Sequence, residues 1–146
     1  MELHKAQELA LELMKKHGLG HWSFRFDHAR RRFGCCHLDK RIISLSFRIT
    51  ALNNEEAVRD TILHEIAHAL SPMMGHGEIW KAKCMEIGAN PSRCYGDEVA
   101  TPALAWKGTC PVCGLIIKKS RKPRFKSWHR HCGNVGQLIV WERNSF

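Results

Sequence analysis

The stretch HEIAH at residues 64–68 places two histidines four positions apart, with a glutamate beside the first. Four positions make about one helical turn, so His64 and His68 can reach one ion from the same helix face. Glu65 falls slightly to the side, where its carboxylate can touch a water without binding the metal. A hydrolytic zinc site needs three protein ligands and an open position. His76, twelve residues after His64, is the candidate third ligand.

The residues before this stretch predict that it belongs to a helix. Asn53 and Asn54 are both good N-caps, and the two glutamates that follow suit the positive end of a helix dipole. An apolar stripe then steps by four residues through Val58, Ile62, Ile66 and Leu70. Because this stripe faces the core, the two histidines point elsewhere. A solvated helix face with two incidental histidines is the alternative interpretation.

The rest of the chain completes an α+β pattern, for which we expect helices on a short antiparallel sheet. Helical periodicity predicts two further helices, over 2–17 and 77–87. Alternating or β-branched residues predict three strands, near 22–26, 31–36 and 41–47. Residues 89–107 have little periodicity and suggest a linker or loop, after which two short apolar strands flank a basic stretch.

Charge divides the chain into two parts. Residues 1–106 contain 14 Lys or Arg and 13 Asp or Glu, a net of +1, whereas residues 107–146 contain nine and one, a net of +8. We therefore predict a core domain over 1–106 and a basic module over 107–146. No run approaches transmembrane length, and acidic residues in the first helix argue against a signal peptide. We expect a cytoplasmic monomer that does not bind membranes. Association with the nucleoid is compatible with this expectation.

The cysteines suit a reducing compartment. Their number, seven, is odd, and two of them have metal-ligand spacing rather than the pattern of a disulfide framework. The four cysteines outside the basic module are expected to be buried, reduced thiols: Cys35, Cys36, Cys84 and Cys94.

The basic module contains two knuckles with the spacing of a structural zinc site. Cys110 and Cys113 form the first, and His129 with Cys132 forms the second, which gives C-x2-C-x15-H-x2-C. A closed tetrahedral site would stabilise a segment too short to build its own core. His131 is a rival to His129 as the fourth ligand. A C-x-x-C pair without metal is the remaining alternative.

Between the knuckles, cationic and aromatic residues alternate in a pattern typical of nucleic-acid binding. Lysine and arginine can neutralise phosphates, and aromatic rings can stack on unpaired bases. The candidate residues are Lys118, Lys119, Arg121, Lys122, Arg124, Phe125, Lys126 and Trp128. We favour polyanion binding over a solvated hairpin tip. The smaller cluster at residues 30–32 is interpreted as an exposed edge, where charge discourages strand pairing.

Together, the HEIAH stretch and the later segment His76-Gly77-Glu78-Ile79-Trp80 resemble the SprT-like metalloproteases, which include the Spartan proteases. The resemblance covers nearly the whole chain and implies a small zincin-like core with a C-terminal zinc ribbon. It implies one catalytic zinc on the three histidines and one structural zinc in the ribbon. Ribbons in this family more often use four cysteines, so His129 departs from that pattern.

The resemblance implies a zinc endopeptidase in which Glu65 is the catalytic base, acting on proteins bound or crosslinked to DNA. Tyr95 is one candidate for stabilising the oxyanion, although we favour a packing or loop role for it. The alternative function is a non-catalytic DNA-binding adaptor that keeps the fold as a scaffold. Glu65 argues against that alternative, because a structural site would not need it.

Overall fold

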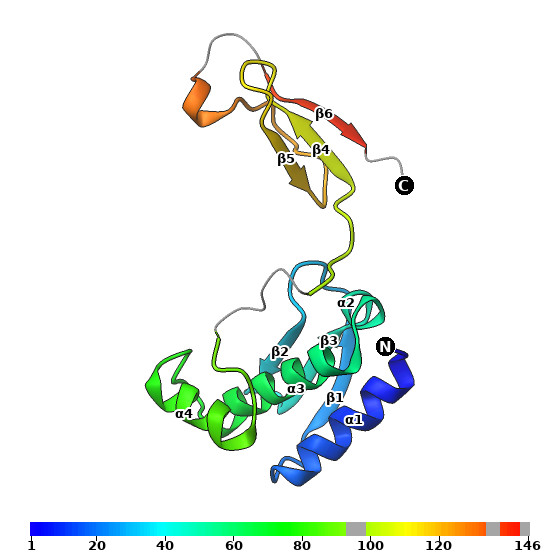
Figure 1. Ribbon diagram of the computed structural model, residues 1–146, viewed down its shortest axis with the longest axis vertical. Coiled ribbons are helices and arrows are strands. Elements are labelled where there is room, and N and C mark those ends of the chain that lie inside the picture. Colours follow the sequence, from blue (N-terminus) through cyan, green and yellow to red (C-terminus); the bar gives the residue numbers. More distant parts are fainter. Residues whose placement is uncertain (93–98, 134–137, 144–146) are drawn as a thin grey trace. The chain divides into compact units, whose positions relative to one another are not determined.

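The computed structural model describes residues 1–92, 99–133 and 138–143, and the chain forms two compact units (Figure 1). The first unit comprises Met1–Pro102 and the second Ala103–Phe146. The described residues form four α-helices and two three-stranded sheets, so the α+β class is confirmed. Within these residues, none of the helices is long and apolar enough to cross a membrane.

The three helices that the sequence predicts in the first unit begin and end close to their expected positions. Asn54 caps the long third helix, since its Oδ1 accepts the backbone N–H of Ala57 at 3.0 Å. Gly88 ends the fourth helix in the left-handed conformation, with φ of 81°. The helices are α1 (Leu3–Lys16), α2 (Phe47–Leu52), α3 (Glu55–Leu70) and α4 (Glu78–Ile87).

The short helix α2 is not expected from the sequence. Its six residues include the β-branched Ile49 and Thr50, and Phe47 continues the pattern of the preceding strand. The helix forms because Ser46 caps it, its hydroxyl accepting the backbone N–H of Ile49 at 3.3 Å. Within this helix, the side chains of Ile49 and Thr50 are fully buried. Tertiary packing thus overrides the strand propensity of this segment.

The sheet of the first unit is mixed, so the prediction of an antiparallel sheet is wrong. Its strands are β1 (Ser23–Asp27), β2 (Gly34–His37) and β3 (Ile42–Ser46) in the order β1-β3-β2. β2 and β3 form an antiparallel hairpin, whereas β1 and β3 run parallel. Ile43 and Leu45 of β3 are fully buried, which explains why β3 rather than β2 takes the central position.

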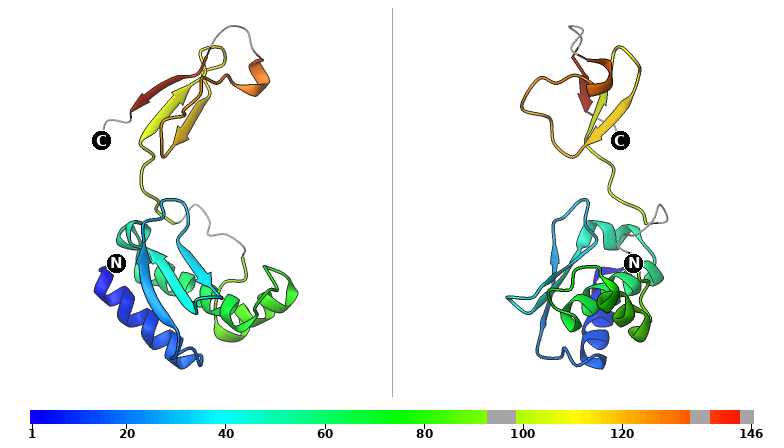
Figure 2. Two further views of the ribbon diagram at one scale, coloured as in Figure 1. Left: turned by 180° about the vertical axis from the view of Figure 1, so that it is seen from behind. Right: turned by 90° about the vertical axis from the view of Figure 1, so that its left-hand side faces the viewer.

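The core of the first unit lies between this sheet and the helices (Figure 2). Leu13 and Met14 of α1 and Ile62 and Ile66 of α3 are almost completely buried there. Phe24 and Phe26 of β1 pack against the same cluster. This packing fixes α3 across the sheet, with β2 as the edge strand beside it.

The second unit is a small antiparallel sheet in the order β5-β4-β6. Its strands are β4 (Trp106–Thr109), β5 (Ile116–Lys119) and β6 (Val140–Arg143), and one 3-10 turn covers Arg130–Cys132. Two strands were expected; β4 is the third, and it begins inside the segment predicted as a loop. Apart from Gly108, only Cys110 and Ile139 are buried among the described residues of this unit, so its apolar core is very small.

Candidate metal centres

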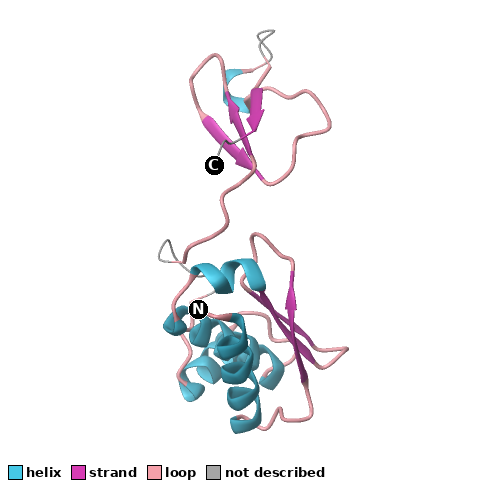
Figure 3. Ribbon diagram, turned by 90° about the vertical axis from the view of Figure 1, so that its right-hand side faces the viewer, coloured by secondary structure: helices cyan, strands magenta, loops and turns pink. Residues whose placement is uncertain are grey.

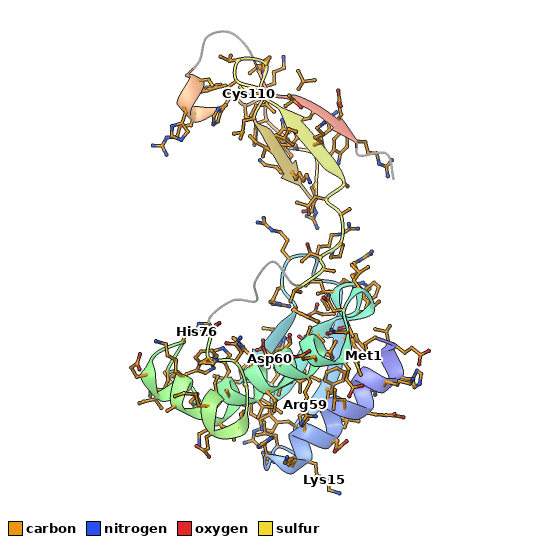
Figure 4. All side chains as sticks on the ribbon, viewed as in Figure 1. Met1, Lys15, Arg59, Asp60, His76 and Cys110 are labelled. Carbon is orange, nitrogen blue, oxygen red and sulfur yellow. The ribbon has the colours of Figure 1, made fainter. Side chains whose placement is uncertain are left out.

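Three histidines converge in the first unit. His64 and His68 lie one turn apart on α3, and His76 lies on the segment that joins α3 to α4 (Figure 4). The Nε2 atom of His76 is 3.2 Å from Nε2 of His68 and 3.4 Å from Nε2 of His64. An ion held tetrahedrally at about 2.0–2.1 Å from each nitrogen would separate the nitrogens by about 3.3 Å. These histidines therefore fit one metal ion without rearrangement.

Both helix-borne histidines are held in the form that binds metals. Burial, reinforced by the neighbouring imidazoles of His68 and His76, lowers the pKa of His64 to about 4. Burial and then the His76 imidazole lower the pKa of His68 to about 4. Neutral imidazole is the ligand form, so at neutral pH neither side chain has to lose a proton before an ion binds.

Glu65 is almost completely buried beside these ligands. Burial raises its pKa to about 7, against the lowering effects of a hydrogen bond from the Cys36 backbone and of the Arg32 charge. Glu65, His64 and His68 line the same cleft, which has a volume of about 1170 Å³. A buried carboxyl with a raised pKa in such a cleft is typical of a group that exchanges protons.

Two residues of the edge strand that support Glu65 were not identified from the sequence. A β-carbon at Gly34 would meet Glu65 at 2.7 Å, so only glycine allows the carboxylate to lie against β2. Cys36 supplies the backbone hydrogen bond. A glycine inside a strand often marks such a close approach, and Gly34 carried that signal.

Trp80 forms a wall behind the three imidazoles. Its ring centroid lies 4.7 Å from that of His64, 5.1 Å from that of His68 and 4.6 Å from that of His76. Trp80 is fully buried, and its Nε1 atom has no hydrogen-bond partner in the described part of the chain. The indole thus contributes through its ring, which limits the orientations open to each histidine.

A second cluster lies in the small unit, where Cys110 is labelled in Figure 4. Its four ligand atoms, from Cys110, Cys113, His129 and Cys132, all lie within 4.8 Å of one another. Nδ1 of His129 is 3.3 Å from Sγ of Cys113 and 3.2 Å from Sγ of Cys132. This donor set suits zinc. The structure thus brings His129 into the cluster, whereas His131 does not belong to this group of four.

The basic and aromatic residues predicted to bind nucleic acid are all exposed. Phe125 is 83% exposed and Trp128 is 46% exposed, so neither is needed to fill a core. Two lysines lie over other rings: Nζ of Lys119 is 5.2 Å from the Trp141 centroid, and Nζ of Lys122 is 5.3 Å from the Trp106 centroid. The full set comprises Lys118, Lys119, Arg121, Lys122, Arg124, Phe125, Lys126 and Trp128.

The remaining sequence candidates are distributed as follows. Cys84 is buried and free, whereas Cys35 and Cys36 are half-buried and free. Tyr95 and Cys94 lie outside the described residues.

The fold and the two clusters define an α+β protein with two candidate metal-binding sites. The pattern of the SprT-like family matches residues 3–100, so the chain belongs to the SprT-like family and the resemblance is confirmed. Protein SprT of Pseudomonas putida (strain GB-1) is 26% identical over 122 residues, which cover 76% of this chain and 74% of that protein. Protein SprT of Pseudomonas entomophila (strain L48) is 20% identical over the same shares.

Proposed function

We propose that the chain is a zinc-dependent endopeptidase with a zincin-like core, acting on proteins bound or crosslinked to DNA. The observation that carries the proposal is the convergence of His64, His68 and His76 within 4.8 Å beside the buried Glu65. Three imidazoles leave a tetrahedral ion one open position, which hydrolytic sites require and closed structural sites lack.

A zinc ion bound by these histidines would supply Lewis-acid activation of a water molecule and of the scissile carbonyl. The protein's own contribution is proton transfer by Glu65. Its Oε atoms accept a proton from the attacking water and return it to the leaving amine nitrogen. Burial of Glu65 favours the step in which it takes the proton, because burial destabilises the charged carboxylate and raises its pKa.

Binding to DNA is assigned to the second unit. Residues 107–146 have a net charge of +8, and the eight candidate contact residues are exposed. Lysine and arginine side chains would neutralise phosphates, and Phe125 would be free to stack on an unpaired base. A zinc ion on Cys110, Cys113, His129 and Cys132 would hold this small sheet together.

The second candidate function is a DNA-binding adaptor without catalysis. The one feature that favours this alternative is the small, strongly basic second unit. The alternative gives no role to a buried glutamate beside three histidines. Metal content separates the peptidase from a protein in which only the second unit binds metal, for which one zinc ion per chain is expected. The peptidase predicts about two zinc ions per chain, one of them exchangeable.

The deciding experiment incubates the zinc-loaded chain with a DNA-bound protein, with and without the DNA, beside Glu65→Gln. We expect cleavage by the native chain and at least a 100-fold loss in Glu65→Gln, with two zinc ions still bound. Equal cleavage by both proteins would exclude Glu65 as the base and the hydrolytic assignment with it.

A further inference from the structure

The charge of the first unit is divided between its sheet and its helices. Residues 23–48, which hold the three strands, their connections and the start of α2, contain seven Lys or Arg and two Asp or Glu, a net of +5. The remaining residues of 1–102 contain seven and eleven, a net of −4. The unit as a whole is nearly neutral, so the division reflects placement rather than total charge.

One face of the sheet is open. In the described part of the chain, the helices of this unit lie on one side of the strands (Figure 3). Phe24 and Phe26 pack into the core on that side. Because side chains alternate along a strand, Arg25 between them points to the opposite, open side, where it is exposed.

The hydrogen bonds identify the other side chains of the open face. The Ser44 hydroxyl donates to Oδ2 of Asp27 at 2.9 Å, and Arg32 donates to the same oxygen at 2.7 Å. Nε2 of His37 lies 3.3 Å from the Ser44 hydroxyl. Asp27 is thus paired with Arg32, so it does not offset the charge of Arg25.

Basic residues also stand at both ends of the strands. Arg30, Arg31 and Arg32 lie in the β1–β2 connection, and Lys40 and Arg41 lie in the β2–β3 turn. Within the described residues, Lys40 and Arg41, like Arg25, have no ion pair. The exposed Asp39 in the same turn is the only other acid of the segment.

The spacing of these cations suits a nucleic-acid backbone. A strand of five residues spans about 17 Å. A DNA strand advances about 3.4 Å along the duplex axis per phosphate, so the face covers about five phosphates. Exposed arginine and lysine at the two ends and the middle of such a span can each reach a different phosphate.

We propose that the open face of the β1-β3-β2 sheet is a second DNA-binding surface, carried by the peptidase unit itself and separate from the zinc-ribbon unit. The proposal rests on the DNA association in the proposed function and adds where the peptidase unit touches DNA. Arg31 and Arg32 belong to the same loop and also line the cleft of His64 and Glu65. DNA bound to this face would therefore reach the mouth of the cleft, where a protein attached to that DNA could enter.

The test measures how the affinity of the full zinc-loaded chain for a 20-base-pair duplex depends on salt. The variant carries Arg25→Gln, Lys40→Gln and Arg41→Gln. The matched control carries Lys5→Gln, Lys15→Gln and Lys16→Gln on α1, which remove the same charge from another part of the unit. A third variant, with Lys118→Gln, Lys119→Gln and Lys122→Gln, removes three of the proposed DNA contacts of the second unit.

Each lost phosphate contact removes about 0.9 from the magnitude of the negative slope of log K against log salt. We therefore expect the slope of the sheet variant to be shallower than that of the native chain by about 2 to 3. The control leaves the slope unchanged, and the ribbon variant retains a measurable slope from the sheet. A slope unchanged by the sheet variant but lowered by the ribbon variant would overturn this inference and keep the proposed function. No DNA affinity in the native chain would overturn both. Weaker cleavage of acidic peptides, with DNA affinity unchanged, would assign the surface to substrate and also overturn it.

Discussion

The carboxylate of Glu65 lies directly against the backbone of Gly34, with no room between them for a β-carbon. A β-carbon at Gly34 would stand 2.7 Å from Oε1 and 2.8 Å from Cγ of Glu65. The hydrogen bond from the Cys36 backbone holds the same carboxylate. The edge strand β2 therefore determines where the proposed base of α3 is held.

Gly34→Ala should displace this carboxylate without touching the histidines. We expect kcat to fall by about 100-fold, because a misplacement of about 1 Å in a catalytic group costs that much. Zinc content should stay at two ions per chain. Gly20→Ala is the matched control, since its nearest neighbours would lie at 3.9 Å, an ordinary contact. Native kcat in Gly34→Ala would show that Glu65 does not need its present position.

Trp80→Leu should weaken metal binding by removing the wall behind the three imidazoles. We expect the affinity for the exchangeable ion to fall by about 10- to 100-fold, as for other groups that orient metal ligands. Trp80→Phe retains a ring and should lose less. Chelator competition measures the affinity, and the visible spectrum of the Co²⁺ form reports the ligand geometry.

Trp22→Leu is the control for Trp80, because Trp22 is a partly buried aromatic residue that packs against the same core. It should lower the free energy of unfolding while leaving the metal affinity unchanged. If Trp22→Leu and Trp80→Leu weakened metal binding equally, the effect of Trp80 would be one of general stability.

The metal-free protein should lose stability as the pH falls from about 6.5 to about 4. Burial lowers the pKa of His64 and of His68 to about 4, so the unfolded chain binds their protons more readily and acid favours unfolding. Glu65 acts in the opposite direction, because its pKa is raised to about 7 and the folded state gains its proton first. Two histidines outweigh one glutamate, so the net slope remains positive with pH.

Glu65→Gln removes that opposing contribution, and we expect a steeper loss of stability in this pH range than in the native chain. Urea titrations of the chelated protein at several pH values measure the slope. In the double variant His64→Gln with His68→Gln only the Glu65 contribution remains, so the slope should reverse in sign. A positive slope that persisted in this variant would assign the acid sensitivity to other groups.

Cys132→Ser should remove one metal ion and unfold the second unit alone. Apart from Gly108, this unit buries only Cys110 and Ile139 among its described residues, which is too little to fold without a metal. The amide NMR signals of β4–β6 should lose their chemical-shift dispersion, while those of α3 keep theirs. The exchangeable ion should remain bound. His131→Ala is the control and should keep both ions; loss of an ion there would make His131 a ligand in place of His129.

The sequence predicted best what depends on local periodicity. The cap at Asn54, the apolar stripe of α3 and the stop at Gly88 each act within a few residues, and all three are present in the structure. One helical turn brings His64 and His68 to one face, as expected. His76, expected because a hydrolytic zinc site needs a third ligand, lies beside both.

What depends on distant partners could not be predicted. The position of β3 between β1 and β2 follows from the complete burial of Ile43 and Leu45 in the core, and the sequence shows three similar short strands. Helix α2 exists because Ile49 and Thr50 are buried by other elements. The contact between Gly34 and Glu65 joins residues 31 positions apart; a glycine within a strand signals a close approach, but it does not identify Glu65 as the partner.

The strand order has a consequence for how the chain folds. The β2–β3 hairpin closes over a short turn and can form early, whereas β1 has to wait for β3 before it finds a partner. During synthesis, β1 therefore emerges before the strand that pairs with it. In this interval the edges of β1 are unpaired and open to pairing with other chains, and slower translation between β1 and β3 would lengthen the interval.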